Sequence, residues 1–79
     1  MLVADRLYWF KRDCGHTCDT STPDSAIAYL SRIIADTHRH ITLIGEPDDG
    51  YEQIVYNDLI DTHNRAVDLC NAIMEGGLE

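Results

Sequence analysis

The chain has 79 residues, which is typical of one small domain, so we expect a single compact acidic domain over residues 1–79. Its hydrophobic content of 44% is too high for a disordered acidic tail, yet so small a core leaves little depth for an enclosed substrate cavity, which argues against an enzyme. Its formal net charge of −8 repels nucleic acid and anionic membranes, so neither is an expected partner.

The negative charge is concentrated in one half of the chain. Residues 1–39 carry five acidic and five basic side chains and are neutral overall. Residues 40–79 carry nine acidic side chains against one arginine, Arg65. Such an asymmetric field bears on binding partners rather than on fold, because it attracts basic surfaces.

The first predicted element is a strand over Leu7–Phe10, an aromatic-rich run bounded by charged residues. Residues 13–22 follow and consist mainly of cysteine, glycine, histidine, aspartate, serine and threonine, a composition typical of a loop. Near the end of this loop, Thr22 suits the N-cap of a helix and Pro23 suits its first position.

The helix that begins at Pro23 carries apolar residues at helical spacing, which predicts one buried face. These residues are Ala26, Ile27, Leu30, Ile33 and Ile34. We expect this helix to end near Thr37 or His38. The β-branched run Ile41–Ile44 then predicts a second strand, stopped by Gly45 and Pro47.

The last third of the chain predicts one long amphipathic helix from about residue 51 to 75, ended by two glycines. At about 100° per residue, its apolar residues share one broad arc. The arc comprises Val55, Tyr56, Leu59, Ile60, His63, Ala66, Val67, Cys70, Ile73 and Met74. Within it we expect Leu59, Ile60, Ala66, Val67, Cys70 and Ile73 to be buried. Ile54 breaks the pattern by pointing outward, so a third strand over 51–56 remains an alternative.

Together these elements predict an α/β fold with β-α-β-α order, in which a parallel, right-handed β-α-β unit precedes the long helix. The alternative is an α+β fold with β-α-β-β-α order. In that alternative, the strand at 51–56 forms a hairpin with the strand at 41–44, and the last helix begins at Asp58.

The candidate binding surface is acidic. Carboxylates spaced about 10 Å apart along one exposed helix face form a row of negative charges. To a basic groove on a partner protein, such a row resembles a phosphate backbone. An exposed helix stabilised for its own sake usually mixes acidic with basic residues, and here only Arg65 does so. With Glu46 beside the leading end of this helix, the predicted partner-binding residues are Asp48, Asp49, Glu52, Asp58, Asp61, Asp68 and Glu75.

The segment Cys14–Cys18 holds the one cluster with metal-ligand chemistry, because His16 lies between the two cysteines and His38 or His40 could complete a zinc site. Its single C-x-x-x-C spacing lacks the paired knuckles of a zinc motif, so we expect neither a metal nor another cofactor. An odd number of cysteines is a poor disulfide framework. Cys70, within the apolar arc, is predicted to be a core thiol.

No catalytic constellation is predicted, so the protein is not expected to be an enzyme. Neighbouring acids would raise the pKa of the Cys14 thiol, which disfavours a nucleophile there. His63 lies on an apolar helix face, where a histidine is more often a core or interface residue than a base. The acidic pair before Gly50 lacks the alternating pattern of a calcium loop.

Charges at Asp5 and Arg6 interrupt the apolar start well before the length of a signal peptide or a membrane span, which predicts a cytoplasmic protein. Trp9 lies near Lys11 and Arg12, a combination that can stack bases and bind phosphates. Two cations cannot outweigh a net charge of −8, so direct nucleic-acid binding is not expected.

In size, charge and type, the chain resembles the small phage-borne anti-CRISPR proteins. The resemblance covers a compact, strongly acidic α/β domain and the acidic residues from Asp48 to Glu75, and it includes no residue-level motif. It implies a non-enzymatic inhibitor in the cytoplasm of a bacterial host cell. Such an inhibitor binds a basic, DNA-handling surface of a CRISPR effector, for example a type I surveillance complex.

Two functions therefore follow from the sequence. The preferred one is an interaction protein whose acidic face occludes a basic, nucleic-acid-binding surface of a larger complex, by pairing carboxylates with lysines and arginines that would hold phosphates. The alternative is a small structural or regulatory subunit that dimerises through its apolar helix face, with the acidic residues serving solubility. The chain is expected to be a monomer or a homodimer.

Overall fold

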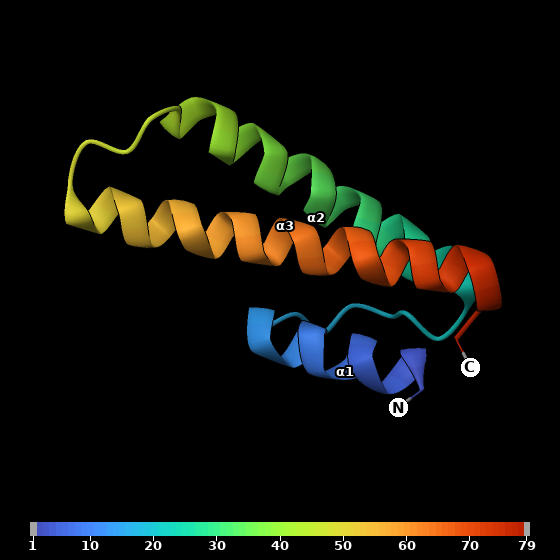
Figure 1. The fold of residues 1–79 in the computed structure, drawn as a ribbon. Coiled ribbons are helices and arrows are strands. Elements are labelled where there is room, and N and C mark those ends of the chain that lie inside the picture. Colours follow the sequence, from blue (N-terminus) through green and yellow to red (C-terminus); the bar gives the residue numbers. More distant parts are fainter. Residues whose placement is uncertain (1, 79) are drawn as a thin grey trace.

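The computed structural model describes residues 2–78, which form three α-helices and contain no strand. The helices are α1 (Val3–Cys14), α2 (Pro23–Ile44) and α3 (Gly50–Gly76). Helices α2 and α3 form an antiparallel hairpin, and α1 lies along the C-terminal half of α3 (Figure 1). The fold is therefore all-α, and both the α/β prediction and its α+β alternative are wrong.

The segment predicted as the first strand, Leu7–Phe10, lies inside α1. Leu7 and Phe10 are buried, whereas Tyr8 and Trp9 between them are 56% and 49% exposed. Val3 and Cys14 extend the buried pair at spacings of four residues, so the segment carries a helical stripe. The aromatic composition suggested a strand, but the spacing of the buried positions is that of a helix.

The second predicted strand, Ile41–Ile44, is the last turn of α2. The polar run that suggested a helix end begins at Thr37, which is a buried position of the same helix face. Its hydroxyl donates a hydrogen bond to the Ile33 carbonyl at 2.8 Å, so the burial of this polar side chain is compensated. The helix therefore continues through the polar run to Gly45, which has a positive φ of 64°.

The predicted start of α2 and the long last helix are confirmed. The Thr22 hydroxyl accepts a hydrogen bond from the Ser25 backbone N–H at 3.2 Å, and the Ser25 hydroxyl accepts one from the Thr22 N–H at 3.1 Å. This reciprocal cap, with Pro23 in the first turn, fixes where the helix begins. Helix α3 runs unbroken over 27 residues, which excludes the alternative strand at 51–56.

The core lies at the end of the hairpin where α1 packs. It consists of Leu7, Phe10, Ala26, Leu30, Ala66, Leu69, Cys70 and Ile73. Of the residues expected to be buried on the last helix, Ala66, Cys70 and Ile73 are confirmed, whereas Leu59, Ile60 and Val67 are only half-buried. Leu69 was missed because it lies outside the predicted apolar arc, on the side of α3 that α1 covers. Met74, placed in that arc, is 61% exposed.

Hydrogen bonds near the two ends of α1 connect it to a residue that follows α3 and to the loop that precedes α2. At its start, the Ala4 N–H donates to the Leu78 carbonyl at 3.0 Å. At its end, the Lys11 ammonium donates to the Cys18 carbonyl and to the Thr20 hydroxyl, which orders the loop that leads to α2. These bonds hold α1 antiparallel to the C-terminal half of α3 (Figure 1).

The molecule is elongated, with extents of 41 × 20 × 18 Å. Helix α1 has 12 residues against 22 in α2 and 27 in α3, so their lengths are about 18, 33 and 40 Å. Thr37 on α2 and Ala66 on α3 mark the limit of complete burial, and no side chain from residue 38 to residue 65 is buried. Among the residues described, no helix is long and apolar enough to span a membrane.

We predict that Phe10→Ala lowers the free energy of unfolding by about 3–5 kcal/mol, because it leaves a cavity between α1 and the hairpin. Phe10 is completely buried and Tyr8 is 56% exposed, so Tyr8→Ala is the matched control and should change stability by about 0.5 kcal/mol. Urea unfolding followed by circular dichroism measures both. Equal losses for the two variants would show that α1 is not anchored through Phe10.

Candidate functional site

The end of the hairpin away from α1 carries most of the negative charge. We call residues 40–64 the distal hairpin. This segment contains six carboxylates and no lysine or arginine, giving a formal charge of −6 out of the total of −8. Its carboxylates are Glu46, Asp48, Asp49, Glu52, Asp58 and Asp61.

Two of these carboxylates also stabilise the start of α3. The Asp49 carboxylate accepts a hydrogen bond from the Glu52 N–H at 2.8 Å and is the N-cap of the helix. The Glu52 carboxylate accepts from the Asp48 N–H at 3.0 Å. Each bond satisfies a backbone donor, and the negative charges lie favourably at the positive end of the helix dipole. Asp49 and Glu52 therefore have a structural role besides their contribution to the acidic field.

Asp58 and Asp61 have no such role. Both are exposed on α3, and among the described residues neither makes a hydrogen bond or an ion pair. Their charge is therefore available to a partner without loss of an internal contact.

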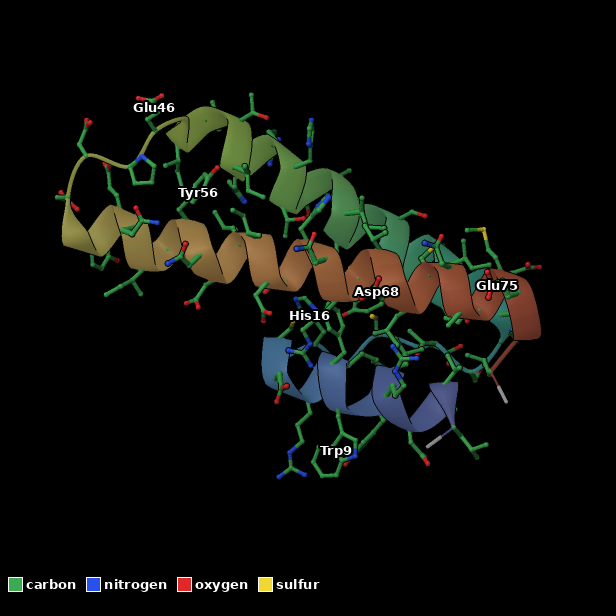
Figure 2. The ribbon with its side chains drawn as sticks, in the orientation of Figure 1. Trp9, His16, Glu46, Tyr56, Asp68 and Glu75 are labelled. Atoms are coloured by element: carbon green, nitrogen blue, oxygen red, sulfur yellow. The ribbon has the colours of Figure 1, made fainter. Side chains whose placement is uncertain are left out.

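The other two predicted residues of the acidic face lie in the C-terminal half of α3, outside the distal hairpin. Glu75 belongs to the last turn of α3, far from Glu46 in the loop between α2 and α3 (Figure 2). Asp68 lines an open cleft of about 290 Å³ between α1 and α3, together with Arg6, Trp9 and Arg65. The seven predicted residues thus do not form one continuous face, because Arg6 of α1 and Arg65 of α3 lie in the cleft beside Asp68.

Arg65, the one cation of the acidic half of the sequence, is directed toward α1. Its guanidinium donates to the Asp13 carboxylate at 3.1 Å and lies over the Phe10 ring at 5.2 Å from the ring centre. The ion pair is substantially exposed, so it contributes little to stability. Its consequence for the site is that Arg65 is engaged at the covered half of α3 and leaves the distal carboxylates uncompensated.

Two apolar side chains accompany the distal carboxylates. Tyr51 is 77% exposed and Ile54 is 63% exposed. With Asp58 and Asp61 they follow at spacings of three, four and three residues, which places all four on one side of α3. We call these four residues the distal stripe. The sequence contained a signal for it, since Ile54 falls outside the apolar arc.

A polar contact marks the boundary between the covered and uncovered halves of the hairpin. The Thr37 hydroxyl, which donates to the Ile33 carbonyl, lies 2.9 Å from His63 Nδ1. Because that hydroxyl has one proton, the bond with the ring requires His63 Nδ1–H to be the donor. His63 is thus a half-buried packing residue between α2 and α3, which fits the structural role expected for it.

The cysteine and histidine cluster does not assemble a metal site. Within residues 2–78, no three histidine, cysteine or acidic side chains are placed to hold an ion. His16 Nδ1 instead lies 2.7 Å from the Tyr29 hydroxyl. Burial raises the pKa of Tyr29 and also that of the Cys14 thiol, so neither group is activated for proton transfer or nucleophilic attack.

We predict that Asp49→Ala lowers the free energy of unfolding by about 1 kcal/mol, because the first turn of α3 loses its cap. Asp49→Asn keeps a capping oxygen and should retain most of the stability. Asp58→Ala, which removes an exposed and unpaired carboxylate from the same helix, should change it by about 0.5 kcal/mol or less. Thermal unfolding at low and high salt separates the loss of the capping hydrogen bond from the loss of a negative charge, because salt screens only the charge effect. A loss common to all three variants would contradict a capping role.

Comparison with known proteins gives neither a family nor a function for this chain. No protein-family model, no curated protein and no solved structure matches the chain. The charge and the packing of the distal hairpin are therefore the observations that bear on function.

Proposed function

We propose that this chain is a non-enzymatic interaction protein whose acidic distal hairpin occludes a basic, nucleic-acid-binding surface of a larger complex. The observation that carries the proposal is the charge of −6 over residues 40–64, with no lysine or arginine to compensate it. These residues form the end of a helical hairpin that α1 does not cover (Figure 1).

The mechanism is competition for cations. Lysines and arginines that bind a nucleic-acid backbone are arranged to pair with phosphates, and charge-assisted bonds to carboxylates use the same donors. Asp58 and Asp61 present such acceptors on a regular helix, and the loop acids from Glu46 to Asp49 continue the charge around the end of the hairpin. Because the field is uncompensated, it also accelerates encounter with a basic partner.

The proposed surface comprises fewer residues than the sequence analysis suggested. We assign it to Asp48, Asp49, Glu52, Asp58 and Asp61, with Glu46 beside them. Asp68 and Glu75 are left out, because Asp68 shares a cleft with two arginines and Glu75 lies at the far end of α3.

The resemblance to anti-CRISPR proteins makes a CRISPR effector complex, in the cytoplasm of a bacterial host, one candidate for a partner with such a basic surface. That resemblance included an α/β fold, which the three-helix structure removes, so it now depends on size and charge alone. The proposed partner is therefore a protein that has a surface rich in lysine and arginine and that binds nucleic acid through this surface.

The second candidate, a self-associating structural or regulatory subunit, is favoured by a different observation. Ile41, Ile44, Val55, Leu59 and Ile60 are only half-buried, so a further layer of protein would bury more apolar surface. The charge opposes it, because two copies that meet through their distal hairpins would bring twelve carboxylates together without a cation.

We predict that the double reversal Asp58→Lys/Asp61→Lys keeps the fold but weakens partner binding at least about tenfold, since two favourable pairings become like-charge contacts. The control Asp5→Lys/Asp36→Lys makes the same change in net charge outside the distal hairpin and should bind nearly as well as the native chain.

The measurement is capture from bacterial lysate by each immobilised variant, identification of the retained protein by mass, and competition with that protein's own nucleic acid. A nucleic-acid-binding protein retained by the native chain, lost from the distal double variant and displaced by nucleic acid supports the proposal. Equal retention by both double variants, or capture that nucleic acid does not oppose, contradicts it.

A further inference from the structure

The distal stripe continues the surface on which α1 lies. Counted onward from Tyr51 at the same spacing, the positions after Asp61 are Arg65 and then Asp68 or Leu69. Arg65 pairs with Asp13 of α1, and Leu69 belongs to the core that α1 closes. One side of α3 is therefore covered by α1 in its second half and by no helix in its first half (Figure 1).

The uncovered half has the size of a short helix. About 15 residues of α3 precede Arg65, and at 1.5 Å per residue they extend over roughly 22 Å. Helix α1 itself is about 18 Å long and fills the corresponding space beside the second half. A helix of three to four turns, placed end to end with α1, would complete a three-helix bundle along the whole hairpin.

From this geometry we infer that the distal stripe is the docking site for a basic amphipathic helix of a partner protein. The inference rests on the proposed function and names the element of the partner that the acidic surface receives. Tyr51 and Ile54 contact the apolar face of that helix, and Asp58 and Asp61 pair with lysine or arginine beside it. Binding of this kind packs an apolar helix face against exposed apolar side chains, with charge setting the choice of partner.

Charge complementarity selects this occupant over a second copy of the chain. The distal hairpin offers no cation to a second distal hairpin. The cations of α1 are in part engaged within their own chain, because Lys11 bonds the loop at Cys18 and Thr20 and the Arg12 guanidinium lies over Trp9. The cations of a helix from another protein are not engaged by these contacts and can pair with Asp58 and Asp61.

The test uses the full chain, labelled with ¹⁵N, and three synthetic peptides of about 14 residues, enough for a helix as long as the uncovered stripe. The first carries leucines on one helical face and lysines and arginines elsewhere. The second has the same composition in an order that scatters the leucines around the helix. The third keeps the leucine face and replaces every cation by glutamate. Amide chemical shifts locate binding, and circular dichroism reports whether the peptide becomes helical.

We expect the first peptide to become helical, to shift amides over residues 51–62, and to bind at least about tenfold more tightly than the second. The glutamate peptide should not bind. Tyr51→Ser/Ile54→Ser should lose at least about tenfold in affinity for the first peptide and keep the fold, because both side chains are exposed. The matched control Leu43→Ser removes an apolar side chain that is 75% exposed on α2 and should bind normally.

Other outcomes overturn the inference in distinguishable ways. Equal affinity for the two basic peptides would exclude helix docking and leave the acidic attraction of the proposed function intact. Shifts confined to residues outside 51–62, or no binding of any peptide, would reject the stripe as the docking site. Concentration-dependent shifts over 51–62 in the free protein, with a dimer by sedimentation, would show that a second copy covers it.

Discussion

Side chains of α2 and α3 are fully buried only in the half of the hairpin that α1 covers, and α1 is short. Helix α1 has 12 residues, fewer than half of the 27 in α3. Complete burial therefore stops at Thr37 on one helix of the hairpin and begins at Ala66 on the other. The core and the proposed binding surface are separated along the same pair of helices, because one half of the hairpin is covered and the other is not.

The position of α1 also determines where charge is neutralised. Arg65 pairs with Asp13 and lies over the Phe10 ring, so the arginine of the acidic half is directed toward α1. Arg6 lines the same interhelical cleft as Asp68. The two arginines that share a cleft with Asp68 thus lie where α1 covers α3, whereas the exposed side chains of the distal stripe lie outside that region.

The acidic end of the hairpin is compatible with a stable fold because part of its charge supports local structure. Asp49 caps α3, and Glu52 accepts a bond from the backbone just before the helix. Negative charge at this end of a helix is stabilising, so the helix dipole offsets part of the mutual repulsion among the loop acids. Asp58 and Asp61, farther along the helix, have no internal partner among the described residues and are the sharper probes of binding.

Local chemistry in the sequence predicted the start of α2 and the extent of α3 correctly. Thr22 with Pro23, and the helical period after Tyr51, act within a few residues and need no tertiary contact. The strand predictions failed where composition was weighed above spacing. The aromatic run of α1 looked like a strand although only Leu7 and Phe10 of it are buried, and the polar run at the middle of α2 looked like a helix end.

The sequence by itself determined the helix caps, the amphipathic period of α3 and the concentration of charge after residue 40. Only the tertiary structure decided which apolar residues are buried and which carboxylates face a cation. Leu69 is buried because α1 packs against that side of α3. Arg65 pairs with Asp13, which lies 52 residues earlier in the chain. Such contacts depend on how segments distant in the sequence pack together. The residue pattern within one segment gives no information about that packing. The division of α3 into a covered half and an uncovered half therefore follows from the packing of α1.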